Sequence, residues 1–233
     1  MAVRDFASRI TSVAALAEPV RQALYLYVVG QPRPVSRDEA AAAVGVPRHV
    51  AKFNLDKLEE AELLDAEYAR PAGRTGPGAG RPAKLYKRSA RDVGVSLPER
   101  RYDLAAQVMA EGITQSKEKG LSIDAALREA ARDAGRALGA EAQRTAGTRR
   151  SRASEIRAVE EVLADTGYEP RSDGDGLSLA NCPFHALAKG HTALVCGINL
   201  DLIDSLLQAS GPRDVRAELS PSPGRCCVRI AKT

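Results

Sequence analysis

The sequence predicts an α+β protein, because helical and strand-like hydrophobic patterns occupy different parts of its 233 residues. Helical spacing and a Gly/Pro/Arg-rich stretch fill residues 1–92, and helical spacing alone continues through residues 93–165. A turn-rich break then opens residues 166–233, which hold short strand-like runs and one helical segment. These patterns predict an N-terminal domain, a helical linker and a small C-terminal domain.

Composition and charge exclude several classes of protein. Hydrophobic residues make up 44% of the chain, which is enough for a packed core. No uninterrupted apolar run reaches the roughly 18 residues expected of a membrane helix. The first residues carry charges without an apolar signal region behind them. We therefore expect a cytoplasmic protein with no membrane partner.

The N-terminal domain begins with an apolar segment, residues 18–29, that predicts a buried helix. Ser36 precedes Glu39 by three positions, which is the spacing of a capping box at the start of a helix. That helix is expected over residues 37–44, and Gly45 is placed to end it.

A second helix is expected over residues 48–63, with Pro47 in its first turn, where a missing N–H is tolerated. Helix, glycine turn and helix form a helix-turn-helix pattern, whose second helix enters the major groove of DNA through its N-terminal residues. The stripe expected to face the core is Ala51, Leu55 and Leu58, and the outward side is His49, Lys52, Phe53 and Asp56. The expected groove contacts are Arg48, His49 and Lys52.

A basic hairpin follows, with strands expected at residues 64–68 and 83–86. The segment from Tyr68 to Arg91 contains seven basic residues and no acidic one, which suits DNA phosphates. A long basic tip of this kind is typical of the wing of a winged helix-turn-helix domain. The expected wing contacts are Arg70, Arg74, Arg81 and Lys84. Two alternatives are a solvated loop for the basic segment and, for the module as a whole, a small helical domain that makes protein contacts.

The amphipathic segments within residues 93–165 leave two interpretations open. Helix-turn-helix proteins usually dimerise to read two half-sites, and helices after the wing are a natural place for a homodimer contact. The same helices could instead cover the C-terminal sheet.

Four cysteines, Cys182, Cys196, Cys226 and Cys227, all lie in the last quarter of the chain. Clustered cysteines without a secretory signal indicate metal, cluster or redox chemistry. The alternative is that these four are buried structural thiols, which pack as small apolar side chains. Thiolates favour iron–sulfur clusters, zinc or Cu(I), but the short Cys-x-x-Cys spacing of zinc sites is missing, so zinc is less expected. We expect Cys182 to be exposed where a strand ends and Cys196 to lie on a helix. Cys226 and Cys227 should occupy opposite faces of a hairpin formed by residues 215–219 and 226–230.

Several stretches resemble the ArsR-related winged-helix transcription regulators, a group that includes the iron–sulfur-binding repressor of the Suf cluster-assembly operon. They are Gly-Arg-Pro-Ala-Lys-Leu-Tyr at 80–86, Cys-Pro-Phe-His at 182–185, Leu-Val-Cys at 194–196 and Gly-Arg-Cys-Cys-Val at 224–228. The resemblance implies a dimeric repressor of a double-stranded DNA operator, with Cys182, Cys196 and Cys226 as cluster ligands. A further cysteine that the resemblance places near Ser210 is missing. His185 and Cys227 are then the candidates for a fourth ligand.

The predicted function is a sequence-specific regulator, and not an enzyme, whose DNA affinity depends on an iron–sulfur cluster or on the redox state of the cysteines. One alternative keeps the DNA-binding half and replaces this input with a small organic ligand. The other is a thiol enzyme, whose sole support is His185 close to Cys182 in the sequence.

Overall fold

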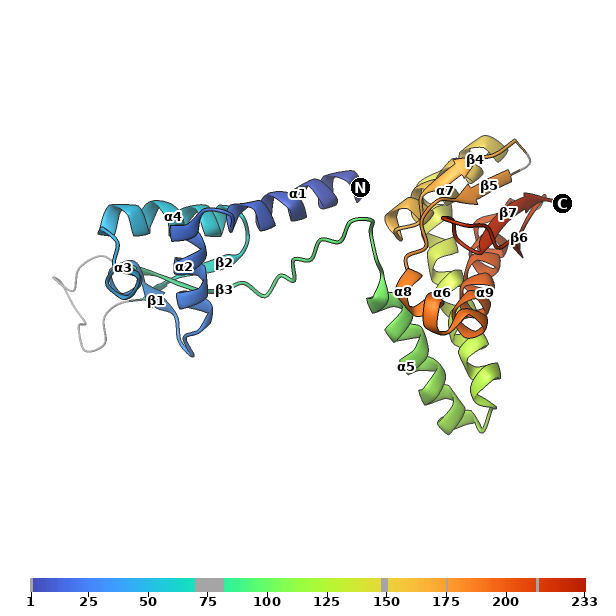
Figure 1. Ribbon diagram of the computed structural model, residues 1–233, viewed down its shortest axis with the longest axis horizontal. Helices are drawn as coiled ribbons and strands as arrows, with labels where there is room; N and C mark the ends of the chain where they lie inside the picture. The colour runs from blue at the N-terminus through green and yellow to red at the C-terminus, as the bar shows by residue number, and fades with distance from the viewer. Residues whose placement is uncertain (1, 70–81, 148–150, 175, 213) are drawn as a thin grey trace. The chain divides into compact units, whose positions relative to one another are not determined.

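The computed structural model describes residues 2–69, 82–147, 151–174, 176–212 and 214–233 (Figure 1). They form two compact units, Met1–Val95 and Ser96–Thr233. The helices of the region 93–165 therefore share a unit, and a hydrophobic core, with the cysteine segment. Each unit combines helices with an antiparallel sheet, as the predicted α+β class requires.

The first unit follows the predicted pattern of caps and turns. Its helices are α1 (Ala2–Ala15), α2 (Pro19–Val29), α3 (Arg37–Val44) and α4 (Arg48–Glu60). The Ser36 hydroxyl accepts the Glu39 N–H at 3.2 Å and so caps α3. The Glu39 carboxylate does not complete the predicted capping box, because it pairs with Arg33 at 2.7 Å. Gly45 ends α3 with φ 74°, a left-handed conformation that glycine adopts without steric cost.

Helix α4 presents the predicted stripe to the core of the first unit. The fully buried side chains are Ala51, Leu55 and Leu58. Pro47 lies just outside the helix as its N-cap, and not within the first turn. The helix ends at Glu60, before the predicted end at Leu63, because Glu62 adopts a left-handed conformation with φ 57°.

A small antiparallel sheet completes the first unit. Its strands are β1 (Val35–Ser36), β2 (Leu64–Ala69) and β3 (Ala83–Arg88), in the order β1-β3-β2. The predicted hairpin is confirmed, with Ala66 opposite Tyr86 and Tyr68 opposite Lys84. Strand β1 was not predicted, because two residues are too few to show a hydrophobic period. Arg70, Arg74 and Arg81 lie outside the described residues.

The second unit packs helices against one face of a second sheet. Its helices are α5 (Tyr102–Lys119), α6 (Ile123–Ala146), α7 (Arg152–Asp165), α8 (His185–Gly190) and α9 (Thr192–Ser210). Its strands are β4 (Pro170–Ser172), β5 (Gly176–Leu179), β6 (Val215–Leu219) and β7 (Val228–Lys232), in the order β4-β5-β7-β6. The predicted C-terminal hairpin is present as β6 and β7, with Ala217 opposite Ile230. Strand β7 begins at Val228, however, so Cys226 and Cys227 precede the strand and do not lie on its two faces as predicted.

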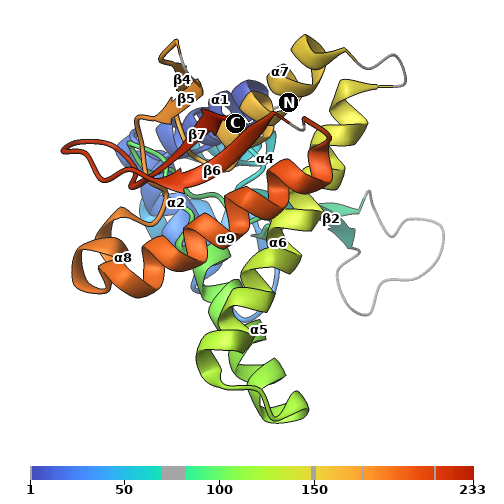
Figure 2. The same cartoon turned by 90° about the vertical axis from the view of Figure 1, so that its right-hand side faces the viewer.

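Helices α6 and α9 run side by side and form the centre of the second unit (Figure 2). Two glycines of α6 allow this close approach: a Cβ atom on Gly135 would clash with the Leu202 carbonyl oxygen, and one on Gly139 would lie 2.5 Å from the Ala209 Cβ. By length and hydropathy alone, α9 could cross a membrane. In the structure its apolar side chains, including Leu202 and Leu206, fill the core of the unit.

Candidate functional site

The start of α4 presents Arg48, His49 and Lys52 on the surface of the first unit. The structure therefore brings the three predicted groove contacts together. Arg48 is held by a bidentate ion pair with Asp38 of α3, at 2.7 Å from Nε to Oδ1 and 2.5 Å from Nη2 to Oδ2. Partial burial opposes ionisation of Asp38, yet hydrogen bonds from Arg37 and Arg48 keep its pKa below the usual value.

This ion pair holds Arg48 in place without removing it from solvent. The side chains of Arg48 and Asp38 are 67% and 52% exposed. Exposed pairs of this kind contribute at most about 1 kcal/mol. A bidentate contact from arginine to a guanine edge is worth about 1–3 kcal/mol of discrimination. DNA can therefore compete with Asp38 for the guanidinium.

Lys84 has a different environment from the one predicted. Its ammonium lies 2.8 Å from Asp56 Oδ1 and also pairs with Glu59, so two carboxylates of α4 hold it. The Tyr86 hydroxyl donates to the same Asp56 oxygen at 2.7 Å. Asp56 was expected to face outward, and this was wrong, because its carboxylate joins α4 to Lys84 and Tyr86 of β3. Lys52 of α4 also pairs with Asp56, at 3.4 Å. Lys84 thus stabilises the packing of β3 against α4. The sequence did not predict this role, because the partners Asp56 and Glu59 are about 25 to 28 residues away.

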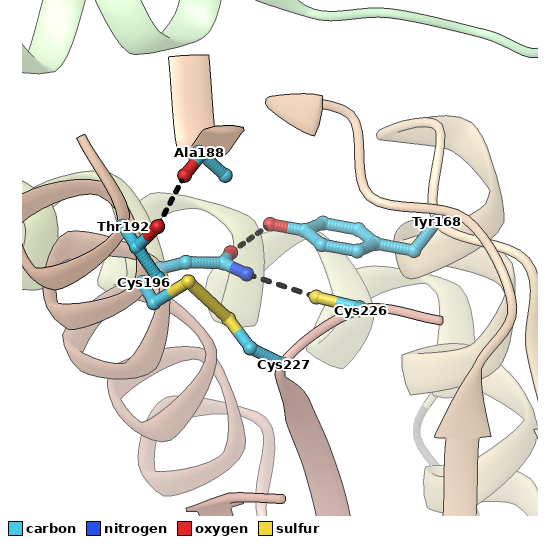
Figure 3. Close-up of a disulfide and its surroundings, with 7 residues drawn as sticks. Tyr168, Ala188, Thr192, Cys196, Cys226 and Cys227 are labelled. Atoms are coloured by element: carbon cyan, nitrogen blue, oxygen red, sulfur yellow. Dashed lines mark hydrogen bonds between the residues drawn. A yellow bond between two sulfur atoms is a disulfide. The ribbon is translucent and has the colours of Figure 1, made fainter. Parts of the chain in front are cut away.

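All four cysteines gather in the second unit, in two pairs. Cys196 of α9 and Cys227, just before β7, form a disulfide (Figure 3). Cys182, after β5, and Cys226 remain thiols and are hydrogen-bonded to each other. Cys182 was expected to be exposed at the end of its strand, and this was wrong, because only 8% of it is accessible. Cys196 lies on a helix as predicted.

A buried polar chain surrounds Cys226. The Asn199 side-chain amide donates to Cys226 Sγ at 3.2 Å, and its oxygen accepts a hydrogen bond from the Tyr168 hydroxyl (Figure 3). Arg100 extends the polar surroundings to Cys182 by donating to its carbonyl oxygen at 2.9 Å. Buried polar groups joined in this way fix the positions of the sulfur atoms.

The hydrogen bond between the two thiols separates their pKa values. Cys226 donates to Cys182 and lowers the pKa of Cys182 to about 7, against the effect of burial and with help from Arg100. The same hydrogen bond, together with burial, raises the pKa of Cys226. Burial also raises the pKa of Tyr168. Since the thiolate is the reactive form, Cys182 is the more reactive thiol of this pair.

Removing the donor tests this assignment. In Cys226→Ala we expect the pKa of Cys182 to rise from about 7 toward the ordinary value of roughly 8.5. The ultraviolet absorbance of the thiolate, followed in a pH titration of the oxidised protein, measures the change, because Cys196 and Cys227 do not titrate while bonded. Cys182→Ala should abolish thiolate formation near neutral pH. An unchanged titration in Cys226→Ala would contradict the assignment.

The predicted metal ligands do not fit a cluster as the structure places them. Cys196 is bonded to Cys227, which leaves two thiols. His185 begins α8 with its side chain exposed, and its backbone N–H donates to the Cys182 carbonyl oxygen at 3.1 Å. Among the described residues, no three His, Cys, Asp or Glu side chains form a group that could hold a metal ion. An iron–sulfur cluster or zinc stays a prediction, and it requires the Cys196–Cys227 bond to open.

Comparison with known proteins gives one match. A helix-turn-helix domain model matches residues 16–67, which span α2, α3, α4 and most of β2. No match was found among curated proteins or among solved structures. The first unit therefore carries the helix-turn-helix domain of a DNA-binding transcription regulator. The resemblance to iron–sulfur repressors receives no support from these comparisons.

Proposed function

We propose that this chain is a sequence-specific, homodimeric transcription regulator whose affinity for double-stranded DNA depends on the redox state of its C-terminal cysteines. The observation that carries the proposal is the exposed cluster Arg48, His49 and Lys52 at the start of the second helix of a helix-turn-helix. The N-terminal end of this helix is the part that meets base edges in the major groove.

The homodimer in this proposal is supported by the general geometry of DNA recognition. A single helix reads only a few base pairs, and regulators of this class usually place two recognition helices one helical turn of DNA apart. The hairpin β2–β3 then contributes phosphate contacts beside each half-site. Lys84 of this hairpin is already paired with Asp56 and Glu59. The expected phosphate contacts are therefore the arginines of the segment between β2 and β3.

The disulfide supports a redox input. It joins α9, the central helix of the second unit, to the segment that leads into β7, 31 residues further along the chain. Reduction would free the start of β7 from α9, and in a dimer such a change can alter the spacing of the two recognition helices. Coupling between sites is typically about 1–3 kcal/mol, or roughly 5- to 150-fold in affinity.

The proposal predicts that the oxidised and reduced proteins differ in DNA affinity by roughly 5- to 150-fold. An operator is first selected from a random duplex library, and binding is then measured by fluorescence anisotropy at one salt concentration. Cys196→Ser and Cys227→Ser should each behave as the permanently reduced form. Sedimentation of the complex should give two chains per operator.

Three outcomes would contradict the proposal. Equal DNA affinity of the oxidised and reduced proteins would rule out the redox input, and one chain per operator would rule out the homodimer. A third arm reconstitutes the reduced protein anaerobically with iron and sulfide. If only the reconstituted protein shows visible absorbance and a changed DNA affinity, an iron–sulfur cluster and not the disulfide controls DNA binding.

A further inference from the structure

A surface pocket of about 410 Å³ lies directly beside the disulfide. Both Cys196 and Cys227 line it, so the S–S bond forms part of its wall. Leu200 of α9 and Leu219 at the end of β6 provide apolar contacts on its sides. A structural disulfide in a core would have neighbouring side chains on all sides, whereas this one borders a space that a small molecule can enter.

Gly197 keeps this space open. It follows Cys196 on α9, and a Cβ atom at this position would meet no heavy atom within 4 Å. Cys227 is half-buried, whereas Cys196 is only 8% exposed. Cys227 is therefore the more accessible residue of the bonded pair to a molecule in the pocket.

The charges around the pocket favour an anionic ligand. Arg128 of α6 lines the pocket with an exposed side chain, and no carboxylate within the described parts of the chain pairs with it. Asp201, the acidic residue of the pocket, is already held by Arg132 at 3.1 Å. The charge left for a ligand is thus the Arg128 guanidinium, which binds carboxylates well.

We propose that this pocket binds a low-molecular-weight thiol carrying a carboxylate, and that this thiol opens the Cys196–Cys227 disulfide by attack on Cys227 Sγ. The ligand thiolate forms a bond to Cys227 Sγ while the S–S bond breaks, and the electron pair leaves on Cys196 Sγ, which takes a proton from water. A second ligand thiolate attacks the ligand sulfur of the mixed disulfide. This releases the ligand disulfide and the Cys227 thiolate, so two ligand thiols are oxidised as one protein disulfide is reduced.

The test uses the full chain without DNA and glutathione as the probe. Free thiols are first blocked with an alkylating agent, and the oxidised protein is then mixed with glutathione and quenched with acid. Peptide mass spectrometry is expected to find the mixed disulfide on Cys227. An adduct on Cys196, or reduction without any adduct on Cys227 at early times, would overturn the proposed direction of attack.

Gly197 offers a matched pair of variants. Gly197→Phe should fill the pocket and slow exchange on the order of tenfold, whereas Gly197→Ala should leave the rate close to wild type. Gly197→Met fills the same space with a flexible side chain and serves if the phenylalanine variant fails to fold. Equal exchange rates in folded pocket-filling variants and in Gly197→Ala would show that the pocket has no part in the reaction.

Arg128→Gln tests the choice of ligand. Loss of the cation should slow glutathione about two- to fivefold, which corresponds to one exposed ion pair, without slowing the neutral thiol 2-mercaptoethanol. Equal slowing of both thiols would exclude carboxylate recognition. The inference rests on the proposed redox input, but the two can fail separately. Unaltered exchange rates in the pocket variants would rule out only the pocket. DNA affinity that does not depend on redox state would rule out only the redox input.

Discussion

Gly135→Ala is expected to destabilise the second unit, although alanine is the better helix former. The added Cβ would meet the backbone of α9 at the Leu202 carbonyl oxygen and would lie 2.9 Å from the Ser205 Cβ. Backbone atoms in a packed core cannot move aside cheaply, and overpacking typically costs about 1–3 kcal/mol. This exceeds the gain of up to about 1 kcal/mol from helix propensity. Gly135→Leu should lower the free energy of unfolding further, by most of the roughly 5–15 kcal/mol that stabilises a domain.

Chemical denaturation followed by circular dichroism measures this effect, and Gly197→Ala is its matched control. Gly197 is also a helical glycine of the second unit, but its Cβ would enter open space. There the same substitution should raise the free energy of unfolding by about 0.5–1 kcal/mol. The two variants are thus expected to change stability in opposite directions. Stabilisation by Gly135→Ala would mean that α6 and α9 do not pack as closely as described.

Arg48→Ala is expected to lower affinity for the selected operator between about fivefold and a hundredfold. The range corresponds to the roughly 1–3 kcal/mol of a bidentate arginine contact to a base edge. The loss is smaller than the full contact energy, because wild-type Arg48 must leave its ion pair with Asp38 before it contacts DNA. Lys52→Ala removes one exposed cation from the same surface. If Lys52 contacts a phosphate, the negative slope of log affinity against log salt should become shallower by about 0.9.

Anisotropy titrations over a range of salt concentrations distinguish these roles. If Arg48 reads a base, affinity for the operator falls more than affinity for random duplex DNA. The control is Arg216→Ala, which removes the same charge from β6 in the second unit, where the side chain is 61% exposed and lies near Glu218. Operator affinity that is unchanged in Arg48→Ala, or lowered equally by Arg216→Ala, would show that α4 is not the recognition helix.

The helix-turn-helix could be predicted because its signals are local. Capping by Ser36, the left-handed turn at Gly45 and the buried spacing of Leu55 and Leu58 depend on neighbours within about one or two turns. The pairing of β2 with β3 followed from two short runs and the turn-rich stretch between them. The interior partners of Lys84 could not be predicted, because they depend on how β3 lies across α4.

Local sequence patterns were enough to predict the DNA-binding helix-turn-helix, with Arg48, His49 and Lys52 at the start of its second helix, and to show that four cysteines lie near the C-terminus. Which cysteines meet depends on how distant segments pack, because four cysteines allow three connectivities and their spacing does not choose among them. The packing of α9 against the hairpin β6–β7 joins Cys196 to Cys227 and leaves Cys182 beside Cys226. The same packing buries Cys182 and places the disulfide at the wall of a pocket, since both results depend on segments that are distant in the sequence.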